Sequence, residues 1–205
     1  MNRGLLLYAI SRVPRGLNRT QVQKLMFRAE LRSPTAPAYR FVRAPHGPLA
    51  QEIYQDTDIL QANGLVTVDR QPAGPYTEVR TSVTPKGLRA TEVLLEQLEL
   101  VEGWTAVREA IEEAASFAES MSATALSDWS HYQVSVRDED GNEFRLHDIA
   151  EGVELLAPAA QCALELPADL LGDIVFGLGL TDADRREMET MALEPVDELL
   201  NLLRA

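Results

Sequence analysis

The chain has 205 residues, of which 45% are hydrophobic and 25% charged, and this predicts a soluble globular protein of one large or two small domains. No apolar run approaches the roughly 18 residues of a membrane span, and Ser11-Arg12 interrupts the run from Leu5 to Ile10, so we expect neither membrane contact nor a secretory signal. The single cysteine, Cys162, excludes an internal disulfide framework and is typical of a cytoplasmic protein.

The net charge of −13 is divided unevenly along the chain. Residues 1–90 carry 13 Lys and Arg against six acids, whereas residues 91–205 carry six basic and 26 acidic residues. In residues 1–50, nine basic side chains stand against one acid, Glu30, which predicts binding to a polyanion such as DNA. The alternative is that the basic face docks on the acidic half of the same chain.

Two helices are predicted before residue 33. The first follows the apolar positions from Leu5 to Val13 and ends at Pro14-Arg15-Gly16. Asn18 is a candidate N-cap for the second, which extends to about Leu31. Its inward positions are Val22, Leu25, Met26 and Ala29, and its other faces carry Arg19, Lys24 and Arg28.

The stretch Tyr39 to Gly87 predicts a strand, a helix and a hairpin in that order. A short strand, Tyr39 to Arg43, is closed by Pro45 and Gly47. A helix then opens at Gly47-Pro48 and ends at Asn63-Gly64. Its apolar face is Leu49, Ile53, Thr57 and Leu60. The strands Leu65 to Arg70 and Thr77 to Thr84 flank a turn rich in Pro and Gly. This is the order of a winged helix-turn-helix.

Six short motifs follow one another between residues 18 and 87. They are Asn18-Arg19-Thr20-Gln21-Val22-Gln23-Lys24-Leu25, Tyr39-Arg40-Phe41, His46-Gly47-Pro48-Leu49, Asp56-Thr57-Asp58-Ile59-Leu60, Gly64-Leu65-Val66 and Thr84-Pro85-Lys86-Gly87. With them, residues 1–95 resemble the winged-helix proteins of the Panacea antitoxin-domain group and its uncharacterised bacterial relatives. The resemblance implies a winged-helix fold and, because that group is associated with neutralising unrelated toxins, a second possible role as an antitoxin-like adaptor.

The third helix, residues 49–62, departs from an ordinary recognition helix. It contains Glu52, Asp56 and Asp58 and neither Lys nor Arg. Gln51, Gln55 and Gln61 have the amide groups that bond base edges, but the acids repel phosphates. A solvated helix face is therefore an equal alternative to base recognition.

After residue 87 the pattern is mainly helical. Helices are predicted over Leu88 to Val101, Trp104 to Met121 and Ser122 to His131, followed by a hairpin of Tyr132 to Arg137 and Glu143 to Leu146, and then by helices over Ile149 to Leu156, Ala168 to Leu178, Asp182 to Ala192 and Val196 to Leu203. Leu88, Leu95, Leu98 and Val107 serve either domain packing or a dimer seam. We expect a winged-helix domain over residues 1–90, connecting or dimerisation helices over 91–121, and an acidic, mostly helical domain with one β-hairpin over 122–205.

The sequence offers no catalytic or metal-binding constellation. His46, His131 and His147 are scattered, and no phosphate-cradling glycine loop or nucleophile elbow is present. The acidic turn Asp138 to Asn142 lacks the spacing of a calcium loop. Asp128-Trp129-Ser130-His131 is interpreted as capping and packing residues. We therefore expect no enzyme, no metal and no cofactor.

The leading hypothesis is a cytoplasmic DNA-binding transcriptional regulator whose fold is mainly α with small β. Its expected DNA contacts are Arg15, Arg19, Lys24, Arg28, Arg40, Arg43, Gln51, Gln55, Arg70 and Arg80. Its expected partners are double-stranded DNA, a second copy in a homodimer, and another protein through the acidic C-terminal half. The rival is a protein-interaction adaptor or antitoxin-like neutraliser that does not touch DNA. We also expect the acidic half to compete with DNA for the same arginines, unless its acids serve only solubility.

Overall fold

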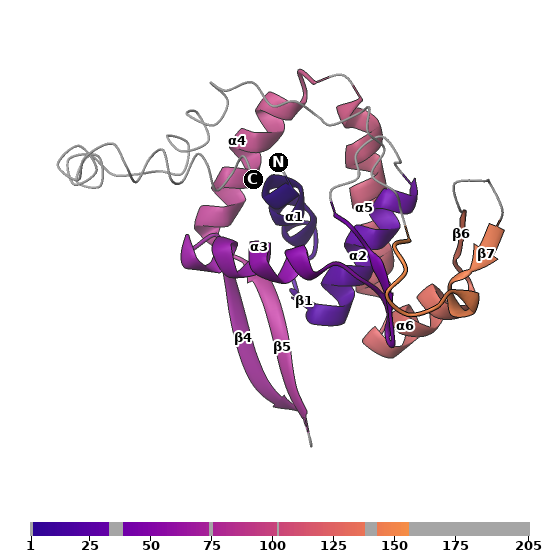
Figure 1. Cartoon of the computed structure of the whole chain (residues 1–205). Helices are drawn as coiled ribbons and strands as arrows, with labels where there is room; N and C mark the ends of the chain where they lie inside the picture. Colours follow the sequence, from indigo (N-terminus) through magenta and orange to yellow (C-terminus); the bar gives the residue numbers. More distant parts are fainter. Residues whose placement is uncertain (1, 33–38, 74–75, 102, 138–142, 156–205) are drawn as a thin grey trace, which may run out of the picture.

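The computed structural model describes residues 2–32, 39–73, 76–101, 103–137 and 143–155 (Figure 1). Its helices are α1 (Asn2–Ser11), α2 (Arg19–Arg32), α3 (Gln51–Ala62), α4 (Pro85–Leu98), α5 (Trp104–Ser120), α6 (Ala123–Tyr132) and the 3-10 helix η1 (Leu146–Asp148). Its strands are β1 (Leu17–Asn18), β2 (Val42–Ala44), β3 (Gly47–Leu49), β4 (Val66–Ala73), β5 (Tyr76–Val83), β6 (Ser135–Arg137) and β7 (Glu143–Arg145). All four strand pairings are antiparallel. The predicted class, mainly α with small β, is confirmed.

Helix α1 lies at the centre of the fold and packs against α2, α3, α4, α5 and β5 (Figure 1). Every residue from Leu5 to Ile10 is buried, so α1 is apolar all round rather than on one face. The apolar run near the N-terminus is therefore the core of the fold. No helix in the described part of the chain is long and apolar enough to cross a membrane.

The turn between α1 and α2 is attached to the hairpin. Asn18 accepts a hydrogen bond from the Gln21 amide at 2.9 Å, and the Gln21 side chain accepts one from the Asn18 amide at 3.0 Å. This reciprocal pair confirms Asn18 as the predicted cap. The same residue pairs with Arg80 in the three-stranded sheet of order β1-β5-β4. The start of α2 and the hairpin are thus held side by side.

The sequence between α3 and α4 behaves largely as local chemistry predicts. Gly64 takes the left-handed conformation, with φ +69°, after α3 ends. Helix α4 begins at Pro85 instead of Leu88, because the Thr84 side chain accepts a hydrogen bond from the Gly87 amide and Pro85 occupies the first turn. Gly87 also permits close contact with the residue before β4, since a Cβ there would lie 2.0 Å from the Leu65 carbonyl oxygen.

The predicted start of the third helix at Gly47-Pro48 and the predicted helix over Ile149 to Leu156 are wrong. Pro48 lies in strand β3, which pairs with β2, and α3 begins only at Gln51. The reason is a tertiary contact. The side-chain amide of Gln23 makes two 2.9 Å hydrogen bonds with the backbone of Ala50 and fixes the chain just before the helix. At the second site, residues 149–155 form no helix.

Residues 152–155 instead lie along the free edge of β2. The amides of Arg43, Gly152 and Leu155 donate to the carbonyls of Val153, Arg43 and Phe41 at 2.8, 2.7 and 2.8 Å. Leu155 and Phe41 are both buried in the apolar core, so a backbone ladder and burial of Leu155 replace the predicted helix. The three helices predicted between residues 168 and 203, and Cys162, lie outside the described residues.

The core is continuous across the expected domain boundaries at residues 90 and 121. One cluster of buried side chains runs from α1 to Leu155, and α5 packs along α2. Within it, Leu98 is 1% exposed and Val107 4%, so these two residues pack inside the chain and do not form a dimer seam. The three-domain division itself stays a prediction.

Candidate nucleic-acid interface

Helix α3 has one buried face and one polar face. Ile53, Asp56 and Leu60 are buried, whereas Gln51, Glu52, Gln55 and Asp58 are exposed. Asp56 accepts a hydrogen bond from Arg3 Nε at 2.7 Å and another from the Tyr39 hydroxyl at 2.8 Å. One of the three acids of α3 is therefore part of the core and does not face a ligand.

The position of Asp56 in the sequence indicates that its side chain is buried. It lies three residues after Ile53 and four before Leu60, which places it on the apolar stripe. A carboxylate on that stripe requires a buried partner, because an unpaired buried charge is costly. Arg3 of α1 supplies that partner. Its positive charge balances the Asp56 carboxylate, which also accepts the hydrogen bond from Tyr39.

Four arginines of the α1–α2 turn, the start of α2 and the hairpin form what we call the basic strip. Its members are Arg15, Arg19, Arg70 and Arg80. The first three are exposed, and Arg80, with a side chain 35% exposed, donates to the carbonyls of Arg15 and Gly16 at 3.1 Å. Arg80 also bonds Glu78 at 2.9 Å. The strip thus runs from the α1–α2 turn onto the hairpin, where Arg70 and Arg80 leave opposite faces, because Arg70 pairs with Val79 and Arg80 is the next residue of β5.

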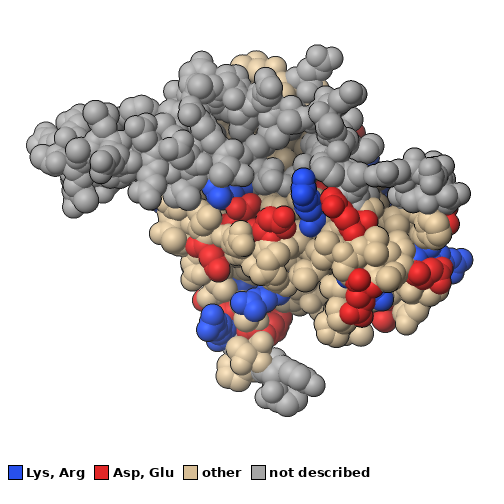
Figure 2. Space-filling model, viewed as in Figure 1, with Lys and Arg blue, Asp and Glu red and all other residues tan. Residues whose placement is uncertain are grey.

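The face that carries the hairpin is not uniformly basic. Figure 2 shows Lys and Arg side chains near the hairpin with Asp and Glu side chains among them. The exposed acids of this region include Glu52 and Asp58 on α3 and Asp69 on β4. A polyanion would therefore meet the basic strip at a limited number of points.

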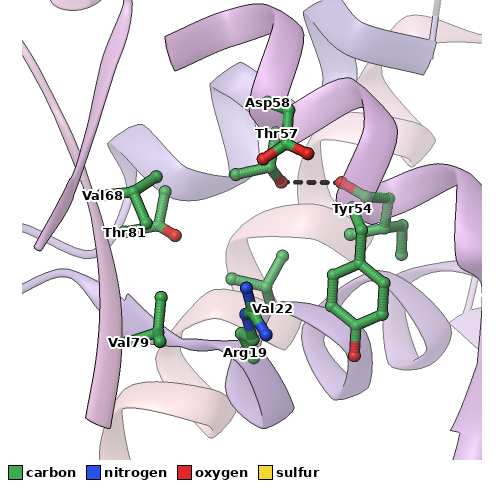
Figure 3. Close-up of a pocket in the computed structure, with 9 residues that line it drawn as sticks. Arg19, Val22, Tyr54, Thr57, Asp58, Val68, Val79 and Thr81 are labelled. Carbon is green, nitrogen blue, oxygen red and sulfur yellow. Dashed lines mark hydrogen bonds between the residues drawn. The ribbon is translucent and has the colours of Figure 1, made fainter. Parts of the chain in front are cut away.

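A small pocket of about 50 Å³ lies between α2, α3 and the hairpin. Its lining residues are Arg19, Val22, Ile53, Tyr54, Thr57, Asp58, Val68, Val79 and Thr81. Figure 3 shows the Arg19 side chain in the opening between Val79 and the Tyr54 ring. The Arg19 guanidinium carbon lies 5.6 Å from the centroid of that ring, so Tyr54 holds the cation at the mouth of the pocket.

Arg70 belongs to the same side of the hairpin as this pocket. It pairs with Val79, and side chains of directly paired residues share one face of a sheet. Val68, two residues earlier in β4, also lines the pocket. Tyr54 is a site residue that the sequence does not predict, because no local pattern indicates a ring contact between residues 19 and 54.

Lys24 is a correction to the predicted site. It is 3% exposed, and its Nζ donates to the carbonyl oxygens of His46 and Pro48 at 2.8 and 3.0 Å. Burial, and then the charge of Arg43, lowers the pKa of Lys24 to about 7. Lys24 therefore fixes the β2–β3 turn and cannot reach a phosphate.

Gly47 makes room for this lysine. Its φ is +94°, and a Cβ there would lie 2.5 Å from Ser130 Oγ and 2.6 Å from Lys24 Nζ. The neighbouring Ser127 hydroxyl donates to the His46 carbonyl at 3.3 Å. Side chains from α2 and α6 thus converge on one turn. This convergence also accounts for Ser130, which packs with no exposed surface.

Two further predicted DNA contacts have internal partners. Arg28 bonds Glu113 at 2.6 Å with only 12% of its side chain exposed. Arg43 is half-buried, and its Nε donates to the Leu146 carbonyl at 3.2 Å. Arg40 is exposed on the segment before β2. Lys24, Arg28 and Arg43 therefore have partners inside the chain, whereas Arg15, Arg19 and Arg70 are exposed, and Arg19 contacts Tyr54 of α3, next to Gln55 in the sequence.

The acidic helix α5 explains part of this separation. Its residues Glu112 and Glu113 lie 3.8 Å from Arg12 and 3.9 Å from Arg32, in addition to the Arg28 contact. For these arginines the structure shows docking of basic residues on the acidic half of the same chain. Such docking is the alternative to DNA binding that the charge distribution allows.

Comparison with known proteins adds no relative. No protein-family model matches the chain, and no curated protein shows significant similarity to it. Within the described residues, no group of three or more His, Cys, Asp or Glu side chains is placed to hold a metal ion.

Proposed function

We propose that residues 1–95 form a winged helix-turn-helix domain that binds double-stranded DNA, and that the protein is a transcriptional regulator. In this assignment α3 is the recognition helix and the β4–β5 hairpin is the wing. The observation that supports it most is the contact of the exposed Arg19 with Tyr54, which places a cation against the helix that carries the exposed Gln51 and Gln55. Cations contact the phosphates, and polar side chains on the helix face the bases.

The basic strip sets the expected strength and salt dependence of binding. Three phosphate contacts, by the exposed Arg15, Arg19 and Arg70, release about three counterions, so the slope of log K against log[salt] is about −3 for B-form DNA. Eight contacts, as the sequence alone implied, would give a slope of about −7. The smaller value follows from the internal partners of Lys24, Arg28, Arg43 and Arg80 and from the position of Arg40 on the segment before β2.

The test is a titration of the full chain with duplex DNA at several salt concentrations. The full chain is required because α5 completes the core around α1 and α2. Replacing Arg19 with Ala is expected to weaken binding and to lower the slope by about 1. Arg32→Ala is the matched control, since it removes an exposed arginine at the other end of α2, ~20 Å away at the helical rise. Absence of binding at low salt would remove this function.

The second candidate is a protein-interaction adaptor or antitoxin-like neutraliser with the same fold. The exposed acids of α3 favour it: Glu52 and Asp58 face solvent, and the helix contains no Lys or Arg. An acidic helix face suits a basic partner protein better than phosphates. Fractionation of the purified protein for bound nucleic acid separates the candidates, since an adaptor would carry none and would not bind duplex DNA at low salt.

A further inference from the structure

The exposed face of α3 carries hydrogen-bonding side chains of only two kinds. Gln51, Gln55 and Gln61 present amides, and Glu52 and Asp58 present carboxylates. Asp56 does not belong to this face, because it is bonded to Arg3 and Tyr39 inside the fold. The chemistry offered to a ligand by α3 is therefore that of neutral amides and carboxylate acceptors.

The N-terminal half of α3 places three of these side chains together. Gln51 and Gln55 are four residues apart and share one side of the helix, and Glu52 adjoins them in the first turn. In helix-turn-helix proteins the N-terminal residues of the recognition helix contact base edges. Arg19 and Tyr54 lie beside this region at the pocket, and the Arg19 side chain is exposed there.

The amide and carboxylate side chains recognise different base edges in the major groove. Adenine presents an acceptor and a donor that match a glutamine amide, and cytosine presents an amino donor that matches a carboxylate. Guanine presents two acceptors, which arginine and lysine recognise best and a carboxylate repels. Glu52 therefore selects for cytosine and against a base edge that carries only acceptors, by an unfavourable contact as well as a favourable one.

We infer that α3 recognises a major-groove site through adenine and cytosine, with Gln51 and Gln55 on adenines and Glu52 on a cytosine, and makes no direct contact with guanine. This inference rests on the proposed DNA-binding function. It gives the acidic helix a role in specificity, while the basic strip outside α3 supplies the affinity. Affinity and base recognition are thus divided between different elements of the fold.

The experiment begins with selection of the full chain on a random duplex library at low salt. The selected duplex is then resynthesised with one modified base type at a time. N6-methyladenine and N4-methylcytosine remove major-groove donors, and each is expected to weaken binding about tenfold at a contacted position. The analogue 7-deazaguanine removes the guanine N7 acceptor and is expected to leave affinity unchanged.

The outcomes separate the inference from the proposed function. Weaker binding with 7-deazaguanine, or unchanged binding with N4-methylcytosine, overturns the inference. Salt-dependent binding without any enriched sequence overturns it too, but leaves DNA binding intact. No binding at low salt overturns both.

A variant provides a second measurement on the protein side. Glu52→Gln keeps the size of the side chain and removes its charge, so the preference for cytosine over the other bases should fall about tenfold while affinity for unrelated DNA rises. Glu96→Gln, at an exposed acid of α4, is the matched control and should change neither. Unchanged discrimination in Glu52→Gln would overturn the assignment of this residue.

Discussion

Arg28 and Glu113 form a two-pronged ion pair between α2 and α5. Arg28 Nε and Nη2 donate to the two carboxylate oxygens at 3.0 and 2.6 Å. The guanidinium carbon also lies 3.7 Å from the Phe117 ring centroid and 5.1 Å from that of Trp129. This arginine therefore joins the basic N-terminal part of the chain to its acidic part by charge, hydrogen bonding and ring stacking together.

Replacing Arg28 should destabilise the protein through the loss of these contacts. Arg28→Ala is expected to lower the free energy of unfolding by about 2 kcal/mol. Arg28→Lys should recover little, because an ammonium cannot pair with two oxygens while stacking on a ring. Denaturant unfolding measures both. Arg32→Ala, whose side chain is 60% exposed, should cost less than about 0.5 kcal/mol; full stability of Arg28→Lys would contradict this account.

The buried Lys24 predicts a pH dependence of stability. Its pKa is lowered to about 7, whereas an unfolded chain holds this proton up to the ordinary value of 10.5. Between these values the unfolded state binds more protons, so stability rises with pH, by up to about 1.4 kcal/mol per unit from this group.

The test compares unfolding free energies of the wild type and Lys24→Met at pH 7.5 and 9. Neither His131, whose pKa burial lowers, nor Tyr39, whose pKa burial raises well above its ordinary value, contributes to the slope in this window. The variant should lose the part of the slope that comes from Lys24. Identical slopes would show that Lys24 keeps its ordinary pKa.

Gly47 should tolerate substitution much less well than Gly64. Both have positive φ, at +94° and +69°, but a Cβ on Gly47 meets Ser130 and Lys24, whereas a Cβ on Gly64 meets nothing within 4 Å. Gly64→Ala is expected to cost about 1 kcal/mol from backbone strain. Gly47→Ala adds a steric clash and should cost about 3 kcal/mol. Thermal or denaturant unfolding of the two variants decides it, and equal losses would mean that the turn moves away from Lys24 at little cost.

A homodimer through α4 remains a proposal with a narrower set of residues. Leu88 is 44% exposed and Leu100, just after α4, is 84% exposed, while Leu98 and Val107 are buried in the chain itself. Light scattering at micromolar concentration should give twice 22.7 kDa for the wild type and the single mass for Leu88→Asp. A wild-type mass of one chain would end the proposal.

The sequence predicted best those features that depend on neighbouring residues. The Asn18 cap, the left-handed Gly64 and the hairpin all follow from local turn and capping chemistry. Pro48 was misread as a helix start because the contacts that extend this segment come from Gln23 and Lys24, more than 20 residues earlier. The same limit applies to the candidate site, where the interior partners of Lys24, Arg28 and Arg43 come from distant elements.

The pairing of residues 152–155 with β2 has a consequence for synthesis of the chain. The edge of β2 has no partner from this segment until residue 155 has been translated, although the N-terminal helices are by then complete. A nascent chain therefore exposes an open strand edge that can pair with another chain. That edge is closed when residues 152–155 pair with β2. Ribosome-bound intermediates that stop before Leu155 should therefore aggregate more readily than the full chain.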